Sequence, residues 1–205
     1  MNKEKYIEDL SDIKNIMSKS SRFISLGGMS GIAAGVVSLI AAYAAYITVY
    51  EGQNYLGYRK VVLTDKTLIT LILIAAITII LTTVLGIYFT AKSAKNNDEN
   101  VWDDQVKRLV MSLAIPLVTG GLLCLILLFK GYVGMLAPLT LIFYGLGLVN
   151  ASKYTHEELR SLGIIEVALG LIGMQFVGYG LLLWAEGFGI LHIVYGIIMK
   201  QRYGS

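Results

Sequence analysis

Six long apolar segments, separated by short polar stretches, dominate the pattern of the chain. They run over about 23–50, 67–91, 106–130, 133–151, 157–184 and 188–201. A helix needs about 20 residues to cross a hydrocarbon core of about 30 Å; the fourth segment is marginal and the sixth is short. The pattern predicts an all-α, polytopic transmembrane bundle with six spans, forming one domain over 23–205. The competing interpretation has five spans and a re-entrant last segment, which would leave the C-terminus outside.

The first 22 residues have a different pattern. Tyr6, Leu10, Ile13 and Met17 recur at helical spacing, with lysine and acidic residues on the other faces. Such a helix is too polar to cross a bilayer but has one apolar stripe. Residues 1–22 are therefore predicted to be a cytoplasmic amphipathic helix at the membrane interface or docked on the protein, with a solvated tail as the alternative.

Composition supports membrane insertion. Of the 205 residues, 56% are hydrophobic and 15% are charged, whereas soluble domains carry about 25% charged residues. The polar first 22 residues and the long run after them do not resemble a cleavable signal peptide. The net charge of +3 gives no reason to expect nucleic-acid binding. The single cysteine, Cys124, excludes an intrachain disulfide.

The basic residues predict the orientation. If the N-terminus is inside, thirteen of the 17 lysines and arginines fall on the cytoplasmic side. The four on the other side are Arg59, Lys60, Lys66 and Lys130. Cytoplasmic loops of membrane proteins carry the excess of lysine and arginine. We therefore expect a multi-pass protein of a cell (inner) membrane, with both termini in the cytoplasm.

A weak internal repeat groups the spans in pairs. The first, third and fifth spans each have a cytoplasmic arginine near their start and a Ser-Leu pair soon after it. These arginines are Arg22, Arg108 and Arg160. The pattern predicts three parallel helical hairpins. Chance similarity between apolar, glycine-rich segments is the alternative.

Three glycines on the first span indicate close helix packing. Gly27, Gly31 and Gly35 recur every four residues, and such faces let another helix backbone approach closely. We expect this face to pack within the bundle, because five other helices need neighbours. A homo-oligomer or a protein partner bound through this helix is the alternative.

Two ionisable residues lie within the predicted membrane. Glu166 is six residues from Arg160, about 9 Å deep, and His192 is about 12 Å from the same face by the 1.5 Å rise per residue. Charged groups at such depth are costly and are functional candidates by default. The sequence therefore predicts a buried polar centre of Glu166 and His192, with Tyr195, Gln175 and Tyr144 within reach.

A structural role competes with this interpretation, since a Glu–His pair can hold two helices together and Glu166 can extend to the cytoplasmic face. No catalytic residue is assigned. Two histidines and one cysteine are too few for a Cys/His metal cluster, and no nucleotide-binding motif is present, so no metal and no cofactor are expected.

The two ends of the apolar region carry a resemblance. The stretch SSRFISLGGMSGIAAG (20–35) resembles the opening of a group of uncharacterised bacterial six-helix inner-membrane proteins, and GFGILHIVYG (187–196) is similar to their closing segment. The resemblance implies a bacterial origin and brings no activity with it.

These features favour a non-enzymatic function. Small size, short outer loops, an amphipathic segment and packing glycines without catalytic groups suggest a membrane-embedded accessory, sensory or regulatory subunit that binds a protein partner. The second hypothesis is a small carrier or channel that uses Glu166 and His192 for proton coupling or substrate binding. An intramembrane lipid-modifying enzyme comes third, because lipid chemistry usually needs more polar groups.

Overall fold

The computed structural model describes residues 28–50, 64–96 and 104–203. The predicted amphipathic segment 1–22 and Gly27 lie outside these ranges. The described part of the chain is helical and contains no strand. Its principal elements are α2 (Gly28–Tyr50), α3 (Asp65–Asn96), α4 (Asp104–Phe129), α5 (Leu136–Ala151), α6 (Glu157–Gln175), α7 (Gly180–Trp184) and α8 (His192–Tyr203).

Five helical segments are long and apolar enough to cross a membrane. They are Gly28–Val49, Asp65–Ser93, Asp104–Phe129, Val133–Tyr154 and Val177–Tyr203. The helix α6 is shorter, at 19 residues, and carries four ionisable side chains, three of them in its first turn. The all-α, membrane-type architecture expected from the sequence is therefore present.

The last two helices meet at a different place from the one expected. The sequence predicts a turn at 185–187, between segments 157–184 and 188–201. The chain instead leaves α6 at Phe176, with φ −116° and ψ 66°. From Val177 a single helical segment runs to Tyr203, and Ala185–Leu191 form one π-helical stretch within it. Gly187 resembled a turn residue, but it lies in the helix where other side chains approach closely.

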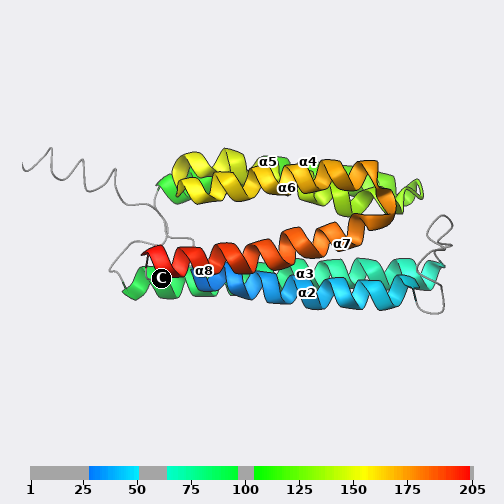
Figure 1. The fold of residues 1–205 in the computed structure, drawn as a ribbon, viewed down its shortest axis with the longest axis horizontal. Helices are drawn as coiled ribbons and strands as arrows, with labels where there is room; N and C mark the ends of the chain where they lie inside the picture. Colours follow the sequence, from blue (N-terminus) through cyan, green and yellow to red (C-terminus); the bar gives the residue numbers. More distant parts are fainter. Residues whose placement is uncertain (1–27, 51–63, 97–103, 204–205) are drawn as a thin grey trace, which may run out of the picture.

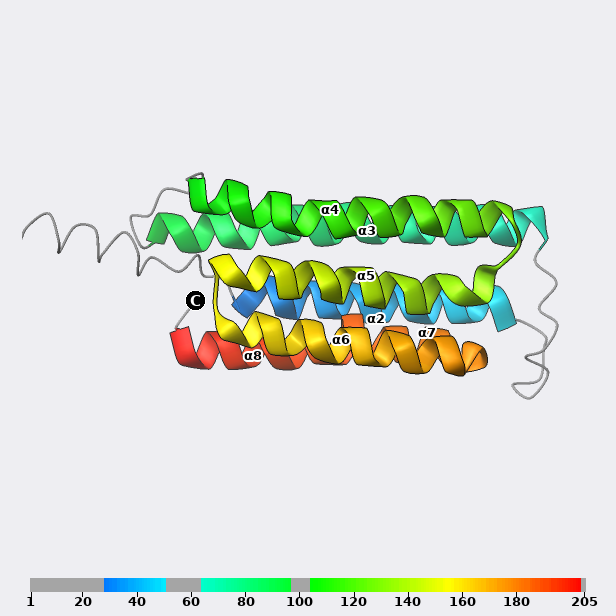
Figure 2. The same cartoon turned by 90° about the horizontal axis from the view of Figure 1, so that it is seen from above.

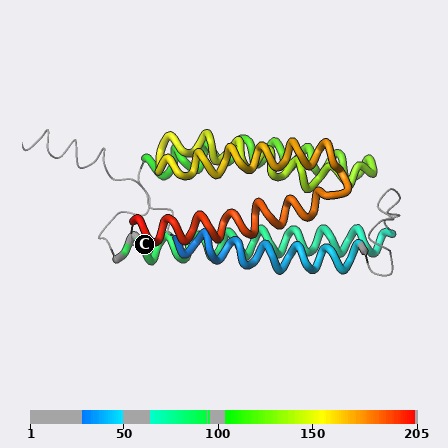
Figure 3. Tube along the Cα trace, viewed as in Figure 1, coloured from blue at the N-terminus to red at the C-terminus, as the bar shows by residue number. Residues whose placement is uncertain are grey.

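The helices form two layers joined by this last helix, Val177–Tyr203. Figures 1 and 2 show α4, α5 and α6 in one layer and α2 and α3 in the other. The last helix begins against α5 and α6 through α7 and ends against α2 through α8, so it crosses from one layer to the other (Figure 3). The π-helical stretch lies at this crossing.

Glycines bring α2 and the last helix together. A Cβ atom on Gly35 would lie 2.6 Å from the backbone oxygen of Gly189, and one on Gly31 would lie 3.2 Å from Cα of Gly196. In the reverse direction, a Cβ on Gly196 would lie 2.5 Å from the backbone oxygen of Gly28. Gly31 and Gly35 of the first span therefore pack inside the bundle and are not free for an external partner.

Larger side chains join the last helix to the other layer. Tyr195 and Met199 of α8 belong to one buried apolar cluster with residues of α4, α5 and α6. The remaining buried members of the cluster are Leu109, Leu148, Ala151, Leu159 and Leu162. This cluster lies between the crossing and the end of the bundle at which α4 and α6 begin and α8 ends. By contrast, no described residue of α3 is buried, and α3 packs mainly on α2.

Candidate functional site

Close packing of α5 on α6 buries Glu166. A Cβ on Gly163 would lie 2.7 Å from the backbone oxygen of Gly145, and one on Gly145 would lie 2.9 Å from Cβ of Glu166. The two helix backbones therefore approach each other closely beside the glutamate. Its side chain is fully buried, with 0% exposure.

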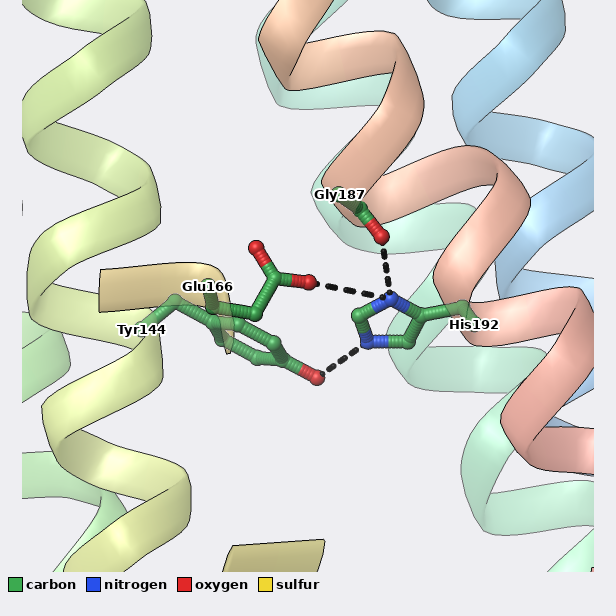
Figure 4. A network of polar contacts seen from close by, with 4 residues as sticks. All are labelled: Tyr144, Glu166, Gly187 and His192. Carbon is green, nitrogen blue, oxygen red and sulfur yellow. Dashed lines mark hydrogen bonds and ion pairs between the residues drawn. The ribbon is translucent and has the colours of Figure 1, made fainter. Parts of the chain in front are cut away.

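His192 is the first residue of α8 and links the two layers. Its Nδ1 atom lies 3.0 Å from the backbone oxygen of Gly187, and its Nε2 atom lies 2.7 Å from the hydroxyl oxygen of Tyr144 (Figure 4). A carbonyl oxygen only accepts hydrogen bonds, so Nδ1 carries a hydrogen. In the neutral ring Nε2 is then the acceptor, and Tyr144 donates to it.

Glu166 approaches the same imidazole without a close hydrogen bond. Its Oε1 atom lies 3.5 Å from Nδ1 of His192, and the hydrogen on Nδ1 is already directed to Gly187. Within the described part of the chain, neither carboxyl oxygen of Glu166 has a hydrogen-bond partner. The expected Glu166–His192 pair therefore exists as a contact, and Tyr144 holds the histidine more closely.

The π-helical stretch makes this arrangement possible. Such stretches occur frequently at functional sites in helices. Here the stretch brings the carbonyl of Gly187 to the side chain five residues later. A Cβ on Gly187 would lie 2.5 Å from Oε2 of Glu166 and 2.5 Å from Cδ2 of Leu141. Only glycine leaves room at this position for the carboxyl group.

Aromatic rings cover one side of the centre. The ring of Phe188 lies 4.8 Å from that of Tyr144 and 5.8 Å from that of His192, centroid to centroid. Trp184 lies 5.0 Å from Phe188 on the side away from α8. These contacts fix the orientation of the tyrosine and of the imidazole.

Two of the five predicted site residues lie outside this network. Tyr195 is buried in the apolar cluster, and its hydroxyl has no hydrogen-bond partner among the described residues. Gln175 is exposed at the end of α6, nine residues beyond Glu166. Gly187 and Phe188 also belong to the centre, although they were not among the predicted site residues. Phe188 lies four residues before His192, on the same helix face, and this spacing was the available signal.

No protein-family model, curated protein or solved structure matches this chain. The geometry and chemistry of the site are therefore the basis for a function. The described residues contain no group of three histidine, cysteine or acidic side chains that could hold a metal ion. Tyr144, Glu166 and His192 are instead groups that can accept, hold and donate protons.

A second polar contact joins the layers at the end of the bundle where α8 ends. Arg202 and Tyr203 both donate to Oε1 of Glu158, the tyrosine over 3.2 Å. The ring of Tyr203 also stacks on His156 at 3.9 Å. Burial lowers the pKa of His156, and the nearby Glu158 acts in the opposite direction. We call these four residues the terminal clamp.

Proposed function

We propose that this chain is a sensory or regulatory membrane subunit in which the Tyr144–Glu166–His192 centre controls the packing of the two layers. It spans a bacterial cytoplasmic membrane six times, as three hairpins, with both ends in the cytoplasm. The observation that carries the proposal is the hydrogen bond between Tyr144 and His192, because it joins α5 of one layer to the helix that ends in the other.

Topology supports the six spans. The beginnings of α4 and α6 and the end of α8 lie at one end of the bundle (Figure 2). Described basic residues gather near that end: Lys92, Lys95, Lys107, Arg108, Lys153, Arg160, Lys200 and Arg202. Lys66 and Lys130 lie at the other end of α3 and α4. The excess of positive charge supports a cytoplasmic position for the first end.

The packing supports a switch between layers. Within each layer, glycines let helix backbones meet, as at Gly145 and Gly163 or at Gly31 and Gly196. Between the layers, contact depends on larger side chains of the last helix and on the polar centre. Packed interfaces of this kind change between discrete arrangements rather than deforming continuously. A change of charge at the centre would therefore alter how α8 meets α5 and α6.

The terminal clamp supplies a cytoplasmic output. It lies one to two turns beyond Tyr195 and Met199 along α8, so a shift of that helix moves Arg202 and Tyr203 relative to Glu158. The contacts of a partner protein bound at this end would change with that shift. Such an output fits the accessory or regulatory role that the short outer loops favour.

Distance measurements between the layers test the proposal. Spin labels at Lys153 and Lys200, both exposed, are placed in a Cys124→Ala background. We expect Tyr144→Phe to change or broaden the label-to-label distance distribution in reconstituted protein. Tyr195→Phe is the matched control, because that hydroxyl has no described hydrogen-bond partner. An unchanged distribution in Tyr144→Phe would contradict control of layer packing by the centre.

A small proton-coupled carrier or channel is the second candidate. The full burial of Glu166 favours it, because intramembrane carboxyl groups are typical of proton relays. Proteoliposomes with an imposed pH gradient separate the two functions. Proton flux that Glu166→Gln abolishes would favour the carrier or channel. Absence of flux in the wild-type protein would favour the regulatory subunit.

A further inference from the structure

We infer that the ligand of the polar centre is a proton held on Glu166. In the arrangement seen here the carboxyl group of Glu166 is protonated and His192 is neutral. This inference rests on the proposal that the centre is the responsive element, and it names the chemical signal to which the centre responds.

The hydrogen bonds of His192 leave no donor for Glu166. Nδ1 carries its hydrogen toward Gly187, and Nε2 accepts from Tyr144. A doubly protonated ring would place a hydrogen on Nε2 and require Tyr144 to accept it, which is possible for a hydroxyl. Even then, the hydrogen on Nδ1 has its nearest acceptor in Gly187, at 3.0 Å, and Glu166 lies farther away at 3.5 Å.

Deep burial makes an ionised carboxylate costly at this position. The side chain is fully buried, and neither oxygen has a hydrogen-bond partner in the described ranges 28–50, 64–96 and 104–203. A buried charge without a close, hydrogen-bonded partner normally neutralises rather than remaining ionised. One proton on the carboxyl group removes the charge and needs no other change in the packing.

On the side of Gly187 and Leu141, the packing leaves no room for a larger ligand beside the carboxyl group. Oε2 lies so close to Gly187 that even a Cβ atom there would meet it at 2.5 Å. Leu141 is fully buried against the same glycine. The described residues around Glu166 supply no third ligand for a metal ion. A proton is a ligand that fits the space beside this carboxyl group.

Among the described residues, few titratable groups face Glu166. They are Tyr144 of α5 and His192 of α8. α7 carries no titratable side chain. Lys153 and Tyr154 lie in the link before α6, Tyr179 is exposed at its far end, and Glu186 is half-buried in the π-helical stretch. Proton binding breaks an O–H bond of hydronium, leaves water and forms an O–H bond on Glu166. Release breaks that bond, returns the proton to water and leaves a carboxylate.

Infrared spectroscopy of the reconstituted full chain tests protonation directly. We expect a protonated-carboxyl band at neutral pH that disappears in Glu166→Gln and shifts in Glu166→Asp. Glu186→Gln is the matched control and should leave the band in place. A wild-type spectrum without this band, or a band that Glu166→Gln leaves unchanged, would overturn the inference. The Asp variant keeps the test valid if the Gln variant does not fold.

Thermal unfolding gives an independent result. Gln resembles a protonated carboxyl group in shape and charge, so we expect Glu166→Gln to unfold at or near the wild-type temperature. If Glu166 were instead a carboxylate paired with a charged His192, the same substitution would break a buried ion pair and lower the unfolding temperature sharply. A large drop would therefore overturn the inference. Spin-label distances that respond to Tyr144→Phe would still support the regulatory proposal.

Discussion

The hydroxyl of Tyr144 donates to Nε2 of His192 over 2.7 Å, because the carbonyl of Gly187 holds the hydrogen of the neutral imidazole on Nδ1. The two residues lie 48 positions apart in the chain, on α5 and α8. Their contact depends on the glycine packing of α5 on α6 and on the crossing of the last helix between the layers. This hydrogen bond therefore forms only when α5, α6 and the last helix are packed together.

Removing this donor should destabilise the fold. Tyr144→Phe leaves Nε2 of His192 without the hydroxyl that satisfies it, and an unsatisfied buried acceptor costs about 1–3 kcal/mol. We expect that loss in the free energy of unfolding, measured by denaturant titration in detergent. Tyr195→Phe should cost less, because its hydroxyl has no described hydrogen-bond partner. Equal losses in the two variants would show that the Tyr144–His192 bond contributes no stability.

Adding one methyl group at Gly187 should disrupt the centre. In Gly187→Ala the new Cβ would lie 2.5 Å from both Oε2 of Glu166 and Cδ2 of Leu141, so one or both must move. Overpacking of a core typically costs about 1–3 kcal/mol. The matched control is Gly86→Ala, since no atom lies within 4 Å of a Cβ there. The helix preference for alanine should leave that control neutral or more stable. A neutral Gly187→Ala would contradict the tight fit around Glu166.

The sequence could predict the depth of Glu166 and His192, because ionisable residues are conspicuous in apolar segments. It could not predict the end of α6. The residues around Phe176 carry no charge and no proline. By contrast, the stretch 185–187 contains a charged residue and a glycine, as turns often do. The helix therefore seemed to continue to 184, and Gln175 was expected beside the centre. Only tertiary contacts reveal that Gly187 is needed for the space it leaves in a π-helical stretch.

The glycines of the first span show a similar limit of prediction from sequence. Their spacing predicts close approach of another helix, but it does not identify that helix. The partner of Gly31 and Gly35 is the last helix, more than 150 residues away. No local pattern encodes a pairing over that distance.

Alanine at these two glycines should give a graded loss of stability. In Gly35→Ala the Cβ would lie 2.6 Å from the oxygen of Gly189, whereas in Gly31→Ala the nearest atom would be 3.2 Å away. We expect the Gly35 variant to lose clearly more unfolding free energy than the Gly31 variant. Size-exclusion chromatography in detergent should show the same oligomeric state for both. A change of oligomeric state without loss of monomer stability would instead place this face between protein copies.

The terminal clamp should make stability depend on pH. The pKa of His156 is lowered in the folded protein, chiefly by burial, and the ordinary value is about 6.5. The unfolded chain therefore takes up this proton first, so the contribution is complete above about pH 6.5 and decreases as the pH falls below it. His156→Phe retains a ring to stack on Tyr203 and removes the titration. We expect the unfolding temperature of this variant to fall less on mild acidification than that of the wild type. His192, the other histidine of the chain, is present in both proteins, so the difference between the two pH profiles isolates His156. Identical pH profiles would show that His156 has the same proton affinity in the folded and unfolded states.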